Sequence, residues 1–202
     1  TQPILHHANT EIERYEKDKL IEGENLLVIT EQGLGDTIQY MRYIPYLRKQ
    51  GFDISFCAQK KLHTLIQASD IDQNPLSPET IDTISKGKFL PLLSLPKYLN
   101  IHPNNPLISS PYIYSTNKLK EKWNKILFKE KKPIIGINWQ GDPQLETKWQ
   151  TGRSILLESF SSLLDQNEIT LLSLQKGFGS EQLDNCSFKD KFVTCQNQIS
   201  ST

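Results

Sequence analysis

Residues 25–36 read NLLVITEQGLGD, and this stretch decides the fold class. Its first half is a short apolar run with the length of a buried strand, and its second half is a turn that contains two glycines. In the segment that follows, Ile38, Met41 and Ile44 recur at a spacing that suits one face of a helix. A second apolar run, ISFCA, occupies 54–58. The order strand, turn, helix, strand predicts a βαβ unit and therefore a parallel sheet with helices packed on it.

The rest of the first half continues this alternation of helices and short strands. Pro45 lies inside the first predicted helix and lacks an N–H donor, so we expect the helix to kink or stop early there. Further along the chain we expect helices at 60–68 and 117–128, short strands at 81–84 and 89–93, and a loop at 101–111.

A charged segment that ends in proline, KEKKP at 129–133, separates this half from a second strand-rich pattern. That pattern predicts strands at 134–139 and 169–174, a polar loop at 140–152, and a helix at 154–164 with Ser154 as its N-cap. We therefore expect a lead-in segment at 1–22, an N-terminal Rossmann-like domain at 23–130 and a partial second domain at 131–202. The second domain is expected to be incomplete, because an independent domain usually needs about 100 residues.

Composition limits the classes of function. Lys plus Arg and Asp plus Glu both number 23, so the basic excess typical of nucleic-acid-binding proteins is absent. No apolar stretch approaches the roughly 20 residues that span a bilayer, and the polar start does not resemble a signal peptide. Three widely spaced cysteines favour neither a disulfide framework nor a metal knuckle. These features predict a cytoplasmic protein with no metal site.

The glycine turn supports three interpretations. A dinucleotide-binding motif G-x-G-x-x-G fails at its third position, which is Ile38, and Asp36 would repel a pyrophosphate there. Asp36 could instead cap the helix, because aspartate is among the best N-cap residues. Thirdly, Asp36 could face a cleft as a general base, kept ionised by the positive end of the helix. The second and third roles are compatible.

Four segments in order carry a family resemblance. The run EQGLGDTIQYMRYIP at 31–45 resembles the opening signature of a bacterial glycosyltransferase domain. This domain often follows tetratricopeptide repeats and is similar to the ADP-heptose:lipopolysaccharide heptosyltransferases. LPLLSLP at 90–96, IGINWQGDP at 135–143 with RSI at 153–155, and SLQKG at 173–177 resemble later elements of the same domain.

The resemblance implies a GT-B fold, in which two Rossmann-like domains bind the acceptor and the nucleotide-sugar donor respectively. Carried over by position, Asp36 matches the aspartate proposed as the general base. The loop around it would meet the acceptor, and several residues of the second domain would meet the donor phosphates. The acceptor-loop residues are Gln32, Gly33, Gly35 and Gln39; the donor-binding residues are Gln140, Gly141, Lys148, Arg153, Gln175, Lys176 and Gly177.

Two departures qualify what the resemblance implies. The loop after Pro143 is longer than the family's and lacks its His/Lys-Asn-Asp core. For Lys148 and Arg153, a role in donor binding therefore competes with an interpretation as solvated surface charges. The family's D-x-V-I-S-x-D-T segment, which holds the donor diphosphate, has no counterpart in the 202 residues. We therefore expect the full-length protein to contain a further C-terminal half, and the resemblance also implies tetratricopeptide repeats before residue 1.

The leading hypothesis is transfer of a sugar from an ADP-heptose-like donor to a glycan or protein hydroxyl, with the nucleotide sugar as co-substrate and no metal or other cofactor. This piece alone is expected to be inactive. One alternative is a binding module that retains only the acceptor half. Another is a Rossmann-type epimerase or dehydrogenase, which the missing glycine and Asp36 oppose.

Overall fold

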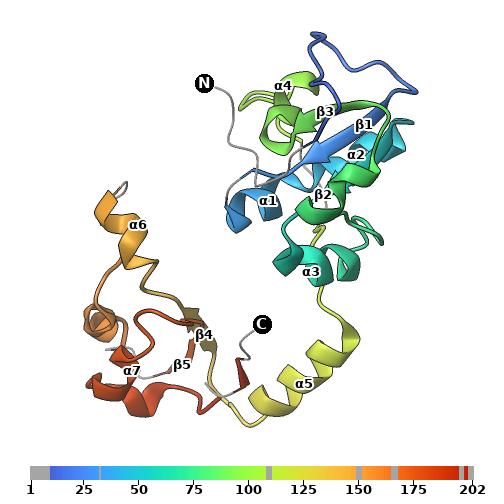
Figure 1. The fold of residues 1–202 in the computed structure, drawn as a ribbon. Helices are drawn as coiled ribbons and strands as arrows, with labels where there is room; N and C mark the ends of the chain where they lie inside the picture. The colour runs from blue at the N-terminus through green and yellow to red at the C-terminus, as the bar shows by residue number, and fades with distance from the viewer. Residues whose placement is uncertain are drawn as a thin grey trace. The chain divides into compact units, whose positions relative to one another are not determined.

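The computed structural model describes residues 10–31, 33–107, 111–148, 152–164, 168–195 and 198–199. The chain divides into two compact units, Thr1–Thr116 and Asn117–Thr202 (Figure 1). The helix predicted at 117–128 is therefore part of the second unit, whereas the sequence analysis placed the domain boundary at 130/131. Each unit is described below by itself.

The first unit is built on a parallel sheet of three strands. These are β1 (Asn25–Ile29), β2 (Asp53–Cys57) and β3 (Lys88–Pro91), in the order β2-β1-β3. Both pairings are parallel, with Val28 of β1 opposite Phe56 of β2 and Leu90 of β3. The predicted βαβ unit and the mixed α/β class are confirmed.

The central strand β1 is buried on both faces, which explains its uninterrupted apolar run. Leu26 and Val28 pack in a large cluster with side chains from the helices, whereas Leu27 and Ile29 pack in a second cluster. Successive side chains of a strand point to opposite faces, so the two clusters lie on opposite sides of the sheet. The large cluster includes Met41, the C-cap residue of the first helix, and the helical residues Ile44, Leu47 and Ile66.

Two short helices follow β1, in the segment where the sequence predicted one helix that kinks or stops early. Helix α1 (Leu34–Tyr40) is followed by α2 (Tyr43–Lys49), and Pro45 is the third residue of α2. A proline ring conflicts with the carbonyl four residues earlier, here that of Met41, so the helix breaks at that point. The break predicted from Pro45 is confirmed. Helix α2 ends before Gly51, which has φ +86°.

The connections after β2 differ in part from the prediction. The segment predicted as a helix at 60–68 forms a 3-10 helix (Lys60–Leu62) and then α3 (His63–Ala68). The strand predicted at 81–84 is wrong, because Pro78–Thr83 forms a 3-10 helix that begins after a Ser77–Thr80 capping box. Ile81, inside this helix, and Ile84, its extended C-cap residue, both pack in the second cluster.

The two segments beside β3 complete the first unit. After β3 the chain enters a 3-10 turn (Leu92–Ser94) and α4 (Leu95–Tyr98), so the predicted strand 89–93 starts and ends earlier. The described part of the lead-in is extended rather than helical: Tyr15 N–H donates to the Phe89 carbonyl at 2.9 Å, and Phe89 N–H donates to the Glu13 carbonyl at 3.0 Å. The lead-in therefore pairs with the outer edge of β3.

The second unit contains a smaller parallel pair. Strands β4 (Ile134–Ile137) and β5 (Thr170–Ser173) pair in parallel, as predicted, and Phe192 forms a further parallel bridge to Leu171 of β5. Its core includes Ile137, Trp139, Leu157, Leu171 and Phe188. The helices are α5 (Asn117–Leu127), α6 (Pro143–Lys148) and α7 (Gln182–Asn185), with 3-10 helices at Leu157–Leu164 and Lys189–Lys191.

Two local predictions in the second unit are wrong. Helix α6 lies within the stretch predicted as a polar loop, and it starts at Pro143, a residue whose missing N–H is tolerated at the first helical position. The predicted helix 154–164 is a 3-10 helix that begins at Leu157, so Ser154 is not its N-cap.

Candidate functional site

The turn that carries Asp36 lies at the carboxyl end of the central strand of the first unit. The chain passes from β1 to β2 on one side and returns to place β3 on the other, so the strand order reverses between β1 and β3. In open α/β sheets, ligands bind at such a reversal, outside the carboxyl ends of the strands. Asp36 is exposed there, as the third residue of α1.

Gly33 shapes this turn in a way that other residues could not. It precedes α1 with φ +100°, in a region that favours glycine, and an added Cβ would lie 2.5 Å from Oδ2 of Asp36. The Asp36 carboxylate therefore folds back over the Gly33 backbone. Gly35 is helical and its missing side chain faces open space.

The structure rules out the role of Asp36 as N-cap. The N-cap residue is Gly33, and no side-chain hydrogen bond caps the helix. Among the described residues, no hydrogen bond or ion pair to the Asp36 side chain is present. The carboxylate is thus exposed, and no described side chain or backbone group binds it.

A second carboxylate, Glu31, lies on the other side of the turn and was not among the predicted site residues. It is half-buried and accepts a hydrogen bond from the Leu93 N–H at 2.8 Å, which ties the end of β1 to the segment after β3. Burial raises the pKa of Glu31, the Leu93 hydrogen bond and Arg14 oppose this shift, and the nearby charge of Asp36 adds to it. Glu31 opens the EQGLGD run, so the motif itself could have pointed to it.

Gln59 anchors the turn from the β2 side and was also missed. It is 5% exposed, and its side chain bonds to the Glu31 carbonyl and to the Thr37 hydroxyl, each at 2.9 Å. Its only sequence signal is a polar residue directly after the apolar run of β2.

A cavity of about 440 Å³ borders the turn at Gly33. Gln59 forms part of its wall, and the charged side chains of Lys60, Lys61 and Glu79 surround it. Leu34 and Pro78 complete the lining. The cavity therefore has charged side chains around a mainly apolar lining, and it meets the Asp36 turn at Gly33 and Leu34.

The other predicted acceptor-loop residues have different placements. Gln32 lies outside the described residues. Gln39 is exposed on α1, three residues after Asp36, and its carbonyl accepts a hydrogen bond from Arg42 Nε at 2.8 Å. Gly33, Gly35 and Gln39 therefore all lie in the Asp36 turn or in the helix that follows it.

In the second unit, Gln175 joins the loops that follow β4 and β5. Its Oε1 accepts from the N–H groups of Trp139 and Gln140 at 3.1 and 3.0 Å, and its Nε2 donates to the carbonyls of Gln140 and Phe178 at 2.9 and 2.5 Å. Gln175 is 2% exposed. It holds the loops in place, and its amide is committed to the protein's own backbone.

The remaining predicted donor-binding residues lie around these loops. Gly141 N–H donates to Ser154 Oγ at 3.0 Å, and Gly177, with φ +75°, accepts from the Ser180 hydroxyl at 2.7 Å. Lys176 and Arg153 are exposed. The side chain of Lys148 lies outside what the structure describes. The structure thus brings Gln140 and Gln175 into direct contact.

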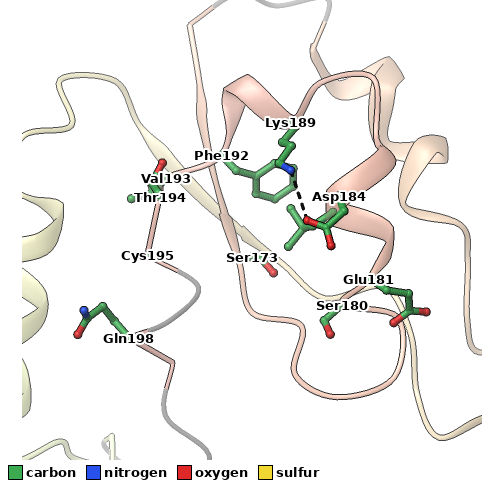
Figure 2. A pocket seen from close by; sticks show the side chains of 11 residues that line it. Ser173, Ser180, Glu181, Asp184, Lys189, Phe192, Val193, Thr194, Cys195 and Gln198 are labelled. Atoms are coloured by element: carbon green, nitrogen blue, oxygen red, sulfur yellow. Dashed lines mark hydrogen bonds and ion pairs between the residues drawn. The ribbon is translucent and has the colours of Figure 1, made fainter.

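A larger cavity, of about 650 Å³, opens beside the end of β5 (Figure 2). Ser173, the last residue of β5, is 4% exposed, and its buried Oγ has no hydrogen-bond partner among the described residues. An ion pair between Asp184 and Lys189, 3.3 Å apart, crosses the upper part of the view beside the Phe192 ring. Glu181 and Ser180 follow the Gly177 turn into the same cavity wall. The sequence analysis predicted none of these residues to be site residues.

Within the described ranges, no group of three or more His, Cys, Asp or Glu side chains could hold a metal ion. Among the helices that the structure describes, none is long and apolar enough to cross a membrane.

Comparisons with protein-family models, with curated proteins and with solved structures found no match to this chain.

Proposed function

We propose that the chain is part of a glycosyltransferase of the GT-B type, with the acceptor on the first unit and a nucleotide-sugar donor, ADP-heptose-like, on the second. Asp36 is the general base of this proposal. The observation behind it is the Asp36 turn: an exposed carboxylate lies at the carboxyl end of the central strand, where ligands bind in open α/β sheets, and Gly33 and Leu34 of the same turn border a cavity. The family resemblance of four sequence segments supplies the reaction.

The proposed step is a single displacement at the sugar's anomeric carbon. The acceptor oxygen forms a bond to this carbon while Asp36 takes the proton from the acceptor O–H. The bond from the carbon to the diphosphate oxygen breaks, and the nucleoside diphosphate leaves with the electron pair. Proton transfer to a positioned base is worth about 10²–10⁴ in rate.

Two features of the second unit support a role in donor binding: a loop held in place by Gln175, and positively charged side chains. Gln175 fixes the loop that contains Gln140, next to exposed Arg153 and Lys176, whose positive charges would stabilise the leaving diphosphate. The cavity beside β5, with the buried Ser173 hydroxyl and Glu181 in its wall, offers polar groups to the rest of the donor. No step requires a metal ion or another cofactor.

The test is the release of nucleoside diphosphate from a panel of ADP-, UDP- and GDP-sugars by the full-length gene product. We expect Asp36→Asn to lower kcat by about 10²–10⁴. Asp53→Asn is the matched control, because Asp53 is also exposed but lies at the amino end of β2, the opposite edge of the sheet. Equal rates for the two variants would reject Asp36 as the base. Donor binding without turnover in the wild type would instead favour a binding module.

A further inference from the structure

The side chain of Gln59 can adopt only one orientation. Its Nε2 donates to the Glu31 carbonyl at 2.9 Å, and its Oε1 lies 2.9 Å from Thr37 Oγ1. The rotated amide would place Oε1 against the carbonyl, which is two acceptors with no hydrogen between them. Because an amide oxygen cannot donate, the Thr37 hydroxyl must donate to Oε1. The weaker contact from this hydroxyl to the Gly33 carbonyl, at 3.2 Å, therefore does not hold its hydrogen.

The two partners of Gln59 flank the Asp36 turn. Glu31 precedes the turn, and Thr37 directly follows Asp36, so one buried side chain joins both ends of the segment. Helix α1 has only seven residues and no side-chain cap, and helices of this length have little stability of their own. The order of the turn must come from contacts outside it; the Gln59 contact with Thr37 is buried, and that with the Glu31 carbonyl is part-buried.

We propose that Gln59, through Thr37 and the Glu31 backbone, is the positioning residue that holds Asp36 in its working geometry. The catalytic part of this inference rests on the proposed role of Asp36 as the base. The structural part, that Gln59 orders the turn, does not.

The structural part is tested by ¹⁵N NMR relaxation of the 202-residue chain. Gln59→Met removes both polar atoms at similar size, and Thr37→Val removes only the hydroxyl. In both variants we expect the backbone order parameters of residues 34–36 to fall from about 0.85 toward 0.6. Thr37→Ser, which keeps the hydroxyl, and Gln67→Met, at an exposed glutamine of the same unit, should leave them unchanged.

The catalytic part is tested by steady-state kinetics of the full-length gene product with the donor found in the panel. We expect Gln59→Met and Thr37→Val to lower kcat by about 10- to 100-fold, because a misplacement of about 1 Å can cost a factor of this size. The donor KM should change by less than about twofold, since the side-chain hydrogen bonds of Gln59 and Thr37 described above lie within the first unit. Thr37→Ser should restore kcat.

The outcomes separate the two claims. Unchanged order parameters in both Gln59→Met and Thr37→Val would overturn the claim that Gln59 orders the turn. Lower order with an unchanged kcat, in an enzyme that Asp36→Asn inactivates, would overturn the positioning role alone. Full activity of Asp36→Asn would reject the proposed function, whereas the NMR result would still show whether Gln59 orders the turn.

Discussion

Replacement of Gln175 by leucine should destabilise the second unit strongly. The side chain is 2% exposed and makes four hydrogen bonds to backbone groups of three residues, Trp139, Gln140 and Phe178. Leucine has a similar size but no polar atom, so the variant leaves two N–H groups and two carbonyls without their partner. The backbone after β4 would then have to move or take up water.

The magnitude follows from these four bonds. Each is worth about 0.5–1.5 kcal/mol net, which gives roughly 2–6 kcal/mol in total. Burial of the leucine side chain returns a part of this, whereas backbone groups left buried and unpaired add to the loss. We expect a loss of about 3–5 kcal/mol in the free energy of unfolding. This is a large part of the 5–15 kcal/mol that is typical of a whole domain.

The aromatic residues allow each unit to be followed separately. The three tryptophans, at 123, 139 and 149, all belong to the second unit, and the seven tyrosines all precede residue 116. Urea unfolding followed by tryptophan emission, excited at 295 nm, should show the destabilisation. Near-ultraviolet tyrosine signals should show an unchanged first unit. Gln198→Leu, at an exposed glutamine of the second unit, is the control. A tryptophan transition within about 0.5 kcal/mol of wild type would refute the reasoning.

Three further predictions concern single residues. Gly33→Ala should lower the free energy of unfolding by about 1–3 kcal/mol, because Gly33 has φ +100° and the added Cβ would meet a carboxylate oxygen of Asp36. Gly35→Ala should raise it by about 0.4–1 kcal/mol, because Gly35 is helical and its added Cβ would meet open space. Urea unfolding followed by tyrosine signals measures both changes. Burial raises the pKa of Glu31, so its contribution to stability is present below about pH 4.5 and is lost as the pH rises through the raised value. Glu31→Gln should remove this part of the pH dependence of the unfolding free energy, and an identical slope in both proteins would contradict the shift. Burial raises the pKa of Cys57 to about 12, so a disulfide reagent at pH 8 should label half-buried Cys186 first and Cys57 only on unfolding; equal labelling rates would exclude this.

The strands were predictable because their signal is local. The apolar runs at β1, β2, β4 and β5 are long enough to identify buried strands, and parallel pairing follows from the helices between them. The break between α1 and α2 was predictable in the same way, because Pro45 lacks the N–H that a continuous helix needs.

The 3-10 helices were not predictable in the same way. The short run around Ile81 fits a strand or a helical turn equally well, and the choice depends on Pro78 and on packing against the second face of the sheet. The Ser154 hydroxyl, expected to cap a helix, instead accepts a hydrogen bond from Gly141 and donates to Glu146. Both outcomes depend in part on packing or hydrogen bonds with residues outside the local pattern.

The residues of the candidate site also differ in whether a local sequence pattern points to them. Asp36 and Gly33 could be proposed as site residues from the sequence because a glycine turn after a strand is a local motif. Gln59 and the Glu31–Leu93 contact were missed because they join segments 28 and 62 residues apart in sequence. Gln175 was expected to bind the donor, and the structure shows that its amide is bonded to the backbone of its own unit.

The most direct measurement is a single-turnover experiment with the full-length gene product, saturated with donor and acceptor, in which the rate of sugar transfer is recorded by rapid quench. Saturation removes any effect of weaker binding. The account predicts that Asp36→Asn slows transfer by about 10²–10⁴, and that Asp36→Glu, which keeps a carboxylate, retains more of the rate. Transfer by Asp36→Asn at the wild-type rate would contradict the assignment of the base.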